Sequence, residues 1–174
     1  MDSLESFKID LRDLEQGATT LKLHLDDDFF SALNTDDIKR GNLTCDMVIY
    51  RTEDVFELKF HTEGTIHIAC SLCLGDMEQS ISTDDALAVK FGDEYSEDDD
   101  LVTVAEDEGI LDVAWFIYEF IELNIPIRHV HAPGKCDSAM VKMLEEYSAA
   151  RSGVDSEDSI DPRWAALAKL KNKD

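Results

Sequence analysis

Apolar and polar residues alternate through much of the first 90 positions, and this alternation predicts β-strands. Two polar sequences, RTED at 51–54 and TEGT at 62–65, divide the central alternating region and predict tight turns. The strands on either side of these turns are therefore expected to form an antiparallel meander. The predicted strands cover, in chain order, residues 7–11, 21–25, 43–50, 55–61, 66–70, 77–81 and 87–91.

A helical spacing of apolar residues replaces the alternation after Asp112 and predicts the main helix. Asp112 is a favourable N-cap, and the helix must end before Pro126, because proline disfavours helical geometry at the residue that precedes it. The apolar face of this helix contains Val113, Phe116, Ile117, Phe120 and Ile121.

Two shorter helices are predicted on either side of this region. Residues 29–33 form a helical turn that Asp26, Asp27 and Asp28 can cap at its positive end. Residues 137–147 form a second helix whose inward face is expected to contain Met140, Val141, Leu144 and Tyr147. Between the strands and the main helix, the sequence DEYSEDDD predicts an unpacked acidic loop, and residues 101–104 predict a final strand.

Together these elements predict an α+β fold, in which two or three helices pack on an antiparallel β-sheet or half-barrel meander. The pattern leaves open whether the strands form an open sheet or close into a barrel. Residues 1–150 are expected to form a single domain, and residues 151–160 a polar linker. A C-terminal helix is predicted at 161–174, with Asp161 as its cap and Pro162 at its first position.

The chain of 174 residues is strongly acidic, with 16 Lys and Arg against 39 Asp and Glu and a formal net charge of −23. A phosphate backbone repels such a surface, so the body as a whole is not expected to lie on nucleic acid. The charge instead favours attraction of a basic partner. The first residues, MDSLESFKID, contain no apolar leader, and no apolar run is long enough to span a membrane. We therefore expect a cytoplasmic protein, of undetermined oligomeric state.

Two segments contain the residue types that bind metals. Cys70 and Cys73 form a Cys-x-x-Cys turn after a strand, which supplies half of a tetrahedral zinc site. The proline-stiffened segment 126–136 offers His131 and Cys136 as the other two ligands, with His129 as a substitute. The alternative is that Cys70 packs in the core, Cys73 is partly exposed and the histidines are ordinary surface residues. Cys45 is in register with apolar neighbours and is interpreted as a core residue.

A thiol oxidoreductase is a second interpretation of the Cys-x-x-Cys pair. Such sites normally lie at a helix N-terminus, which stabilises the thiolate, and no helix is predicted to begin at Ser71 or Leu72. The chain also contains no glycine-rich phosphate loop, nucleophile elbow or HExxH helix. A non-enzymatic protein with a possible zinc ion is therefore the preferred interpretation.

Basic residues gather in two places despite the overall negative charge. Arg128 and Lys135 flank the two histidines of the 126–136 segment, which contains no acidic residue. A second group contains Arg163, Lys169 and Lys171. Both groups are candidates for contact with RNA phosphate or with a partner. Lys169 and Lys171 are equally well explained as favourable charges at a helix C-terminus.

The chain resembles the YceD-type family of large ribosomal RNA subunit accumulation proteins. The resemblance extends along the whole chain through short segments in a specific order. These are FKIDLRDLEQG, the GTIHIACSLCL segment at 64–74, VKFG at 89–92, IELNIPIRHVH before Cys136, and the closing DPRWAALAKLK. The family's Cys-x-x-Cys corresponds to Cys70 and Cys73, its histidine to His131 and its later cysteine to Cys136. Many members have a fuller cysteine set after the proline loop, so a metal in this chain would depend on histidine.

The resemblance implies a non-enzymatic ribosome assembly factor that large-subunit rRNA needs in order to accumulate. In the preferred hypothesis the acidic body binds a basic large-subunit ribosomal protein, and the basic Cys/His loop makes a specific contact. The first alternative is a zinc protein that binds structured large-subunit rRNA directly. The second is the thiol oxidoreductase.

Overall fold

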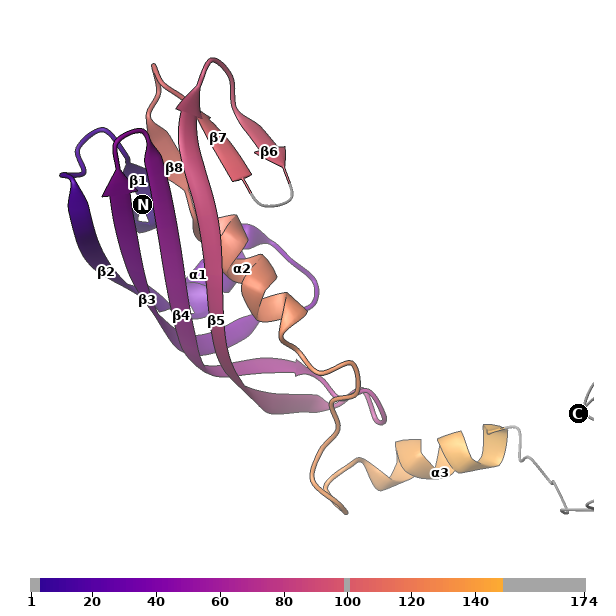
Figure 1. Cartoon of the computed structure of the whole chain (residues 1–174). Helices are drawn as coiled ribbons and strands as arrows, with labels where there is room; N and C mark the ends of the chain where they lie inside the picture. Colours follow the sequence, from indigo (N-terminus) through magenta and orange to yellow (C-terminus); the bar gives the residue numbers. More distant parts are fainter. Residues whose placement is uncertain (1–3, 99–100, 149–174) are drawn as a thin grey trace, which may run out of the picture. The chain divides into compact units, whose positions relative to one another are not determined.

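The computed structural model describes residues 4–98 and 101–148. Three long antiparallel strands form its centre: β3 (Arg40–Thr52), β4 (Val55–Ala69) and β5 (Asp76–Gly92). Their side chains alternate between a buried and a partly exposed face, as expected for a sheet that is covered on one side. Figure 1 shows these strands side by side and curving along their length. The remaining strands are β1 (Lys8–Asp10), β2 (Gly17–Leu25), β6 (Ser96–Asp98), β7 (Leu101–Ala105) and β8 (Ile110–Asp112).

The main sheet is open and has the strand order β2-β3-β4-β5-β7-β6. All neighbouring pairs are antiparallel except β5 and β7, which are parallel. Strands β1 and β8 form a separate antiparallel pair. The α+β prediction is thus confirmed, and the sheet does not close into a barrel.

Helices α1 (Asp27–Leu33) and α2 (Ala114–Leu123) supply the other half of the core. Phe29 and Phe30 of α1 and Ile117 and Ile121 of α2 are almost completely buried. A short 3-10 turn (Glu5–Phe7) adds Phe7 to this core. Burial of large side chains at about 1.5–3 kcal/mol each makes this face the main source of stability.

Helix caps agree with the sequence at α1 and shift by one residue at α2. The Asp26 side chain accepts hydrogen bonds from the N–H groups of Asp28 and Phe29, as a capping aspartate should. Asp112, predicted as the N-cap of the main helix, is instead the last residue of β8, and Val113 precedes the first helical turn. The Asp112 carboxylate still accepts the N–H of Ala114 at 2.9 Å.

The predicted turn at TEGT is wrong, because β4 continues through it without interruption. Gly64 there has φ +149° and pairs with both Leu43 and Ile81. A Cβ on Gly64 would collide with the backbone oxygen of Asn42 and lie 2.6 Å from the Leu43 Cα. Gly64 is therefore needed for a close approach between strands and does not mark a turn.

Three further predictions also differ from the structure. Residues 77–81 and 87–91 belong to the single strand β5, and the acidic loop contains β6, which pairs with β7. Helix α3 (Ser138–Tyr147) begins one residue after the predicted start, but no residue of it is buried, and Tyr147 is 79% exposed. The predicted inward face of α3 is therefore wrong.

The chain divides into two compact units, residues 1–141 and 142–174. The proposed linker at 151–160 and the C-terminal helix at 161–174 lie outside the described residues, so both remain predictions. Among the described residues, no helix has the length and apolar character needed to cross a membrane.

Candidate metal centre

The Cys-x-x-Cys sequence forms the six-residue turn that joins β4 to β5. The Cys70 N–H donates to the Gly75 oxygen at 2.8 Å, and the Leu74 N–H donates to the Cys70 oxygen at 2.9 Å. Leu74 adopts a left-handed conformation, with φ +58°, to close this turn. The Leu72 N–H points at the Cys70 sulfur at 3.4 Å. The backbone thus fixes both thiols and directs an N–H group at one of them.

The segment after α2 is attached to this turn by backbone hydrogen bonds. Ser71 N–H donates to the His129 oxygen at 2.8 Å, and His129 N–H donates to the Ser71 hydroxyl at 3.3 Å. A second turn follows, in which Lys135 N–H donates to the Ala132 oxygen at 3.0 Å. These contacts bring residues 129–136 to the Cys-x-x-Cys turn, although 58 positions separate Cys73 from His131.

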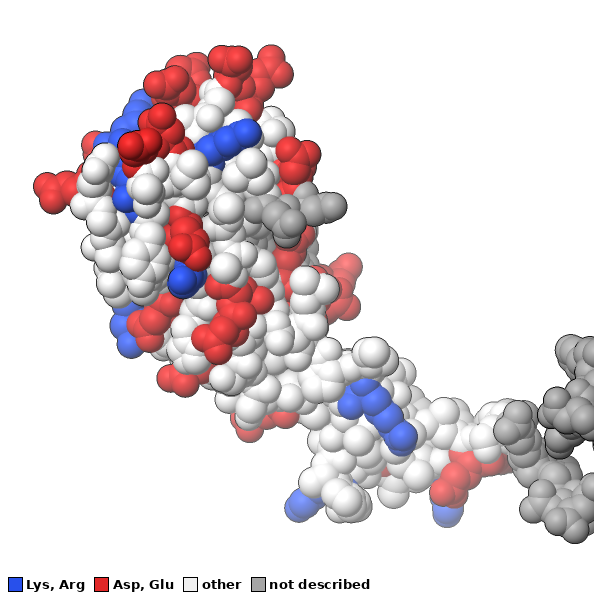
Figure 2. Space-filling view, in the orientation of Figure 1, with Lys and Arg blue, Asp and Glu red and all other residues white. Residues whose placement is uncertain are grey.

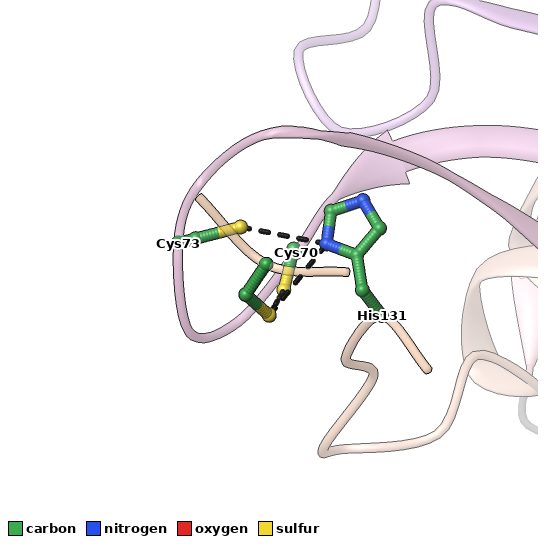
Figure 3. Close-up of side chains that lie close together, drawn as sticks. Cys70, Cys73 and His131 are labelled. Carbon is green, nitrogen blue, oxygen red and sulfur yellow. Dashed lines mark hydrogen bonds between the residues drawn. The ribbon is translucent and has the colours of Figure 1, made fainter. Parts of the chain in front are cut away.

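Cys70, Cys73, His131 and Cys136 meet at this point, and their ligand atoms all lie within 4.8 Å of one another. The sulfurs of Cys70 and Cys136 are 3.9 Å apart, and the Cys73 sulfur is 3.4 Å from the His131 Nδ1. Zinc–sulfur bonds of about 2.3 Å in a tetrahedron place two sulfurs about 3.8 Å apart. The spacing and the donor types therefore fit a tetrahedral zinc ion. Figure 3 shows the Cys70 and Cys73 thiols beside the His131 ring.

The His131 ring is oriented by a hydrogen bond on the side that faces away from the thiols. Its Nε2 lies 3.0 Å from the backbone oxygen of Asp76, so Nε2 carries the proton and donates it to that oxygen. In the neutral ring Nδ1 is then the unprotonated nitrogen, and it faces the sulfurs of Cys73 and Cys136 at 3.4 and 3.8 Å. Metal-binding histidines typically use the second ring nitrogen in this way, to fix both the tautomer and the ring direction.

The pKa values of the three thiols differ, and they determine which cysteines lose a proton most readily when a metal binds. Burial raises the pKa of the Cys70 thiol. The N–H groups of Cys73, Leu72 and His131 together lower this pKa by more than burial raises it, and the resulting pKa is about 5. N–H groups of Asp137 and Gly75 lower the pKa of Cys73. Burial and the two neighbouring thiols raise the pKa of Cys136 to about 11. Metal ligands are thiolates, so metal binding would release the protons that remain on these thiols, and the raised pKa of Cys136 makes it the last to lose its proton.

His129, the predicted substitute ligand, lies outside this cluster. Its Nδ1 faces the backbone oxygen of Pro126 at 2.8 Å. Cys45 is completely buried in the hydrophobic core, as predicted. Cys73 is also buried, at 5% exposure, which differs from the alternative in which it was partly exposed.

The predicted basic contacts are only partly described. Arg128 and Lys135 are exposed on the segment that carries His131. Arg163, Lys169 and Lys171 lie outside the described residues, so their role remains a prediction.

The sequence did not reveal a charged network that supports the turn. The Asp76 carboxylate contacts His67 Nδ1 at 3.1 Å and Arg40 at 2.9 Å, and its backbone oxygen holds His131. The hydrogen bond to His67, followed by the one to Arg40, lowers the pKa of Asp76. The registers of β3 with β4 and of β4 with β5 bring these groups together, and only the correct strand pairing could have predicted the network.

A family model for the large ribosomal RNA subunit accumulation protein YceD matches residues 58–171, well over half of the chain. The match includes all four residues of the Cys/His cluster. Comparisons with curated proteins and with solved structures gave no significant match. On the strength of the family match, the chain belongs to the YceD family of large ribosomal RNA subunit accumulation proteins.

Proposed function

We propose that this protein is a non-enzymatic assembly factor of the large ribosomal subunit, which binds a basic ribosomal protein in the cytoplasm. Membership of the YceD family carries the assignment, because the family name relates to accumulation of large-subunit ribosomal RNA. The net charge of −23 supports a basic partner in preference to a bare phosphate backbone.

The distribution of acidic residues adds to this argument. Strand register places four loops at the same end of the main sheet: residues 11–16, 53–54, 93–95 and 106–109. The strand ends that these loops follow or precede are paired, Gly17 with Arg51, Val55 with Lys90, and Gly92 with Ala105. Figure 2 shows Asp and Glu gathered at this end, which is uppermost in the view. We call it the acidic end, and its exposed carboxylates are Asp13, Glu15, Glu53, Asp54, Asp93, Glu94, Glu106, Asp107 and Glu108.

The Cys/His cluster has a structural role in this proposal. Zinc bound by Cys70, Cys73, His131 and Cys136 would lock the 129–136 segment onto the β4–β5 turn. The exposed Arg128 and Lys135 would then be presented in a fixed position beside the turn. No chemical step is assigned to the cysteines.

Sucrose-gradient sedimentation of lysates from cells lacking the protein tests this proposal. Fewer large-subunit particles and less large-subunit rRNA are expected, and the wild-type gene on a plasmid should restore both. Unchanged particle profiles and rRNA levels would show that the proposal is wrong.

Direct binding of large-subunit rRNA is a second candidate function. The exposure of Arg128 and Lys135 favours it, and among the described residues no ion pair joins either side chain to a carboxylate. The double variant Arg128→Glu, Lys135→Glu should weaken binding of an rRNA fragment and lower its salt dependence.

The matched control for this experiment is Lys59→Glu, Lys90→Glu, which makes the same charge change on the exposed side of β4 and β5. It should bind the fragment like the wild type. If wild-type protein does not bind large-subunit rRNA fragments at low salt, the second candidate function is excluded.

A further inference from the structure

A pocket of about 360 Å³ lies next to the Cys/His cluster and takes no part in metal binding. The connection between α1 and β3 forms one wall, and the segment after α2 forms another. The end of β4 contributes Ile68 and Ala69, and the apolar lining is completed by Ile125, Pro126 and Ile127. An apolar concave surface of this kind is suited to a side chain with a long aliphatic part.

Three carboxylates line the same pocket: Asp36, Asp37 and Glu122. No lysine or arginine lines it, and within the described part of the chain no ion pair involves these acids. Burial raises the pKa of Glu122, and the charge and hydrogen bond of Asp37 raise it further. The pocket thus holds negative charge that the protein itself does not neutralise.

Two large aliphatic side chains at and after the end of α2 face water, and one of them lines this pocket. Ile127 is fully exposed, at 102%, and Leu123 at the end of α2 is 81% exposed. Ile127 also lines the pocket, so the apolar surface continues from the interior to the outside. Exposed aliphatic groups next to an acid-lined pocket are typical of a binding surface for a peptide with both basic and apolar residues.

We propose that this pocket binds a basic and apolar segment of a large-subunit ribosomal protein. A lysine or arginine places its aliphatic stem on Ile68 and Ile125 and its cation at Asp37 and Glu122. A neighbouring apolar residue of the partner packs on Ile127. The source of the partner rests on the proposed function, whereas the chemistry of the segment follows from the pocket. The three carboxylates exclude an RNA phosphate from this place.

The metal centre shapes one wall of this pocket. His129 lines the pocket and exchanges two hydrogen bonds with Ser71 in the Cys-x-x-Cys turn. Its ring is held by the Pro126 oxygen at 2.8 Å. The wall is therefore fixed by the same turn that carries Cys70 and Cys73, and folding of the cluster prepares the pocket for its ligand.

The test is an NMR titration of the full chain with the synthetic peptide GLRLKG, and with GLQLQG as the uncharged peptide. Amide shifts are expected to concentrate at Ile68, Ala69, Ile125 and Ile127 with the basic peptide only. The triple variant Asp36→Asn, Asp37→Asn, Glu122→Gln should weaken binding by roughly tenfold. Ile127→Ala should weaken it by roughly threefold.

The matched control removes three charges from the acidic end, as Glu53→Gln, Asp93→Asn, Glu94→Gln. It should change the dissociation constant by less than about twofold. Equal weakening by both triple variants would mean unspecific attraction and would overturn the inference. The same holds if the peptide shifts other residues, or if an RNA oligonucleotide shifts the pocket residues.

Three further outcomes decide between this inference, another occupant of the pocket and the proposed function. If deletion of residues 161–174 alone shifts the pocket resonances, the chain's own terminus occupies the pocket and the inference is wrong. If cells lacking the protein lose large-subunit rRNA but the pocket variant binds the peptide normally, the inference fails and the proposed function stands. If those cells keep normal rRNA while the peptide binds in the pocket, the proposed function fails instead.

Discussion

The two turns at opposite ends of β4 both connect it to an antiparallel neighbour, but they contain different numbers of residues. At the acidic end, Glu53 and Asp54 alone connect β3 to β4, and Thr52 pairs directly with Val55. At the other end, the turn from Cys70 to Gly75 connects β4 to β5, and Ala69 pairs with Asp76. Two residues are enough to reverse an antiparallel strand. The four additional residues of the second turn therefore serve the cysteines and not the connection.

The two ends also differ in what surrounds them. The acidic end is made of loops whose carboxylates face water, and it contains none of the four cysteines of the chain. The Cys/His end combines three thiols, an oriented imidazole and the exposed Arg128 and Lys135. The carboxylates that would attract a basic partner and the residues of the candidate metal site therefore lie at opposite ends of the same sheet.

The largest expected effect is the loss of bound metal from the Cys/His end when one thiol is removed. Cys70→Ser removes a ligand from the Cys/His end, and bound zinc should fall from about one ion per chain to near zero. Metal analysis of freshly purified protein measures this. Cys45→Ala, which removes a buried thiol from the core, should leave the metal content unchanged. Full metal content in Cys70→Ser would contradict the proposed ligand set.

The second change addresses the strand between the two ends. Gly64→Ala should destabilise the protein by roughly 2–4 kcal/mol, because its φ is +149° and the new Cβ meets the β3 backbone. Urea unfolding measures the loss. Gly134→Ala also has a positive φ, of +78°, but nothing within 4 Å, and should cost only about 1 kcal/mol. Equal losses in both variants would mean that crowding at Gly64 is unimportant.

The third change compares the two turns directly. Glu53 and Leu74 both adopt left-handed conformations, with φ of +54° and +58°. Glu53→Gly and Leu74→Gly should each raise the free energy of unfolding by about 0.5–1 kcal/mol, since glycine tolerates this conformation. Thermal unfolding tests this expectation, and metal content should be the same as in the wild type. A destabilised Leu74→Gly would reveal a packing role for the leucine side chain.

The smallest expected effect concerns Glu122, near the Cys/His end. Its raised pKa means that the folded state binds the proton more tightly than the unfolded state, so stability falls as pH rises through the folded-state pKa. Glu122→Gln should therefore be slightly more stable than the wild type at neutral pH. The gain should be below about 0.5 kcal/mol because solvent screens the exposed carboxylate.

The pH dependence provides the check on Glu122. The difference between variant and wild type should disappear below the unshifted pKa of 4.5, where the carboxyl is protonated in both states. Urea unfolding at several pH values measures it. A variant that is less stable than the wild type at neutral pH would show that Glu122 makes a favourable contact.

The elements that depend on periodicity were predictable from the sequence. The alternation of Leu43, Cys45, Met47 and Ile49 defined both the strand β3 and its buried face. The three cysteines of the candidate site were also predictable, since few other side chains in the chain bind soft metals. In both cases residue type and spacing alone were sufficient.

The errors occurred where tertiary contacts outweighed local composition. Gly64 has the composition of a turn, but its role is to let β4 approach β3 closely. The residues Ser96–Asp98 are too acidic for a typical strand, yet β7 provides a partner for them at the sheet edge. His129 and His131 could not be distinguished in sequence, because only the Asp76 backbone oxygen orients the second ring towards the thiols.

The distance along the chain between the two halves of the Cys/His cluster has a consequence for protein synthesis. Cys70 and Cys136 are 66 positions apart, and residues leave the ribosome at about 5–20 per second. Cys70 and Cys73 therefore spend several seconds outside the ribosome before Cys136 emerges. During that interval the nascent chain is open to oxidants and to competing metals, and it becomes protected only once the last ligand has emerged.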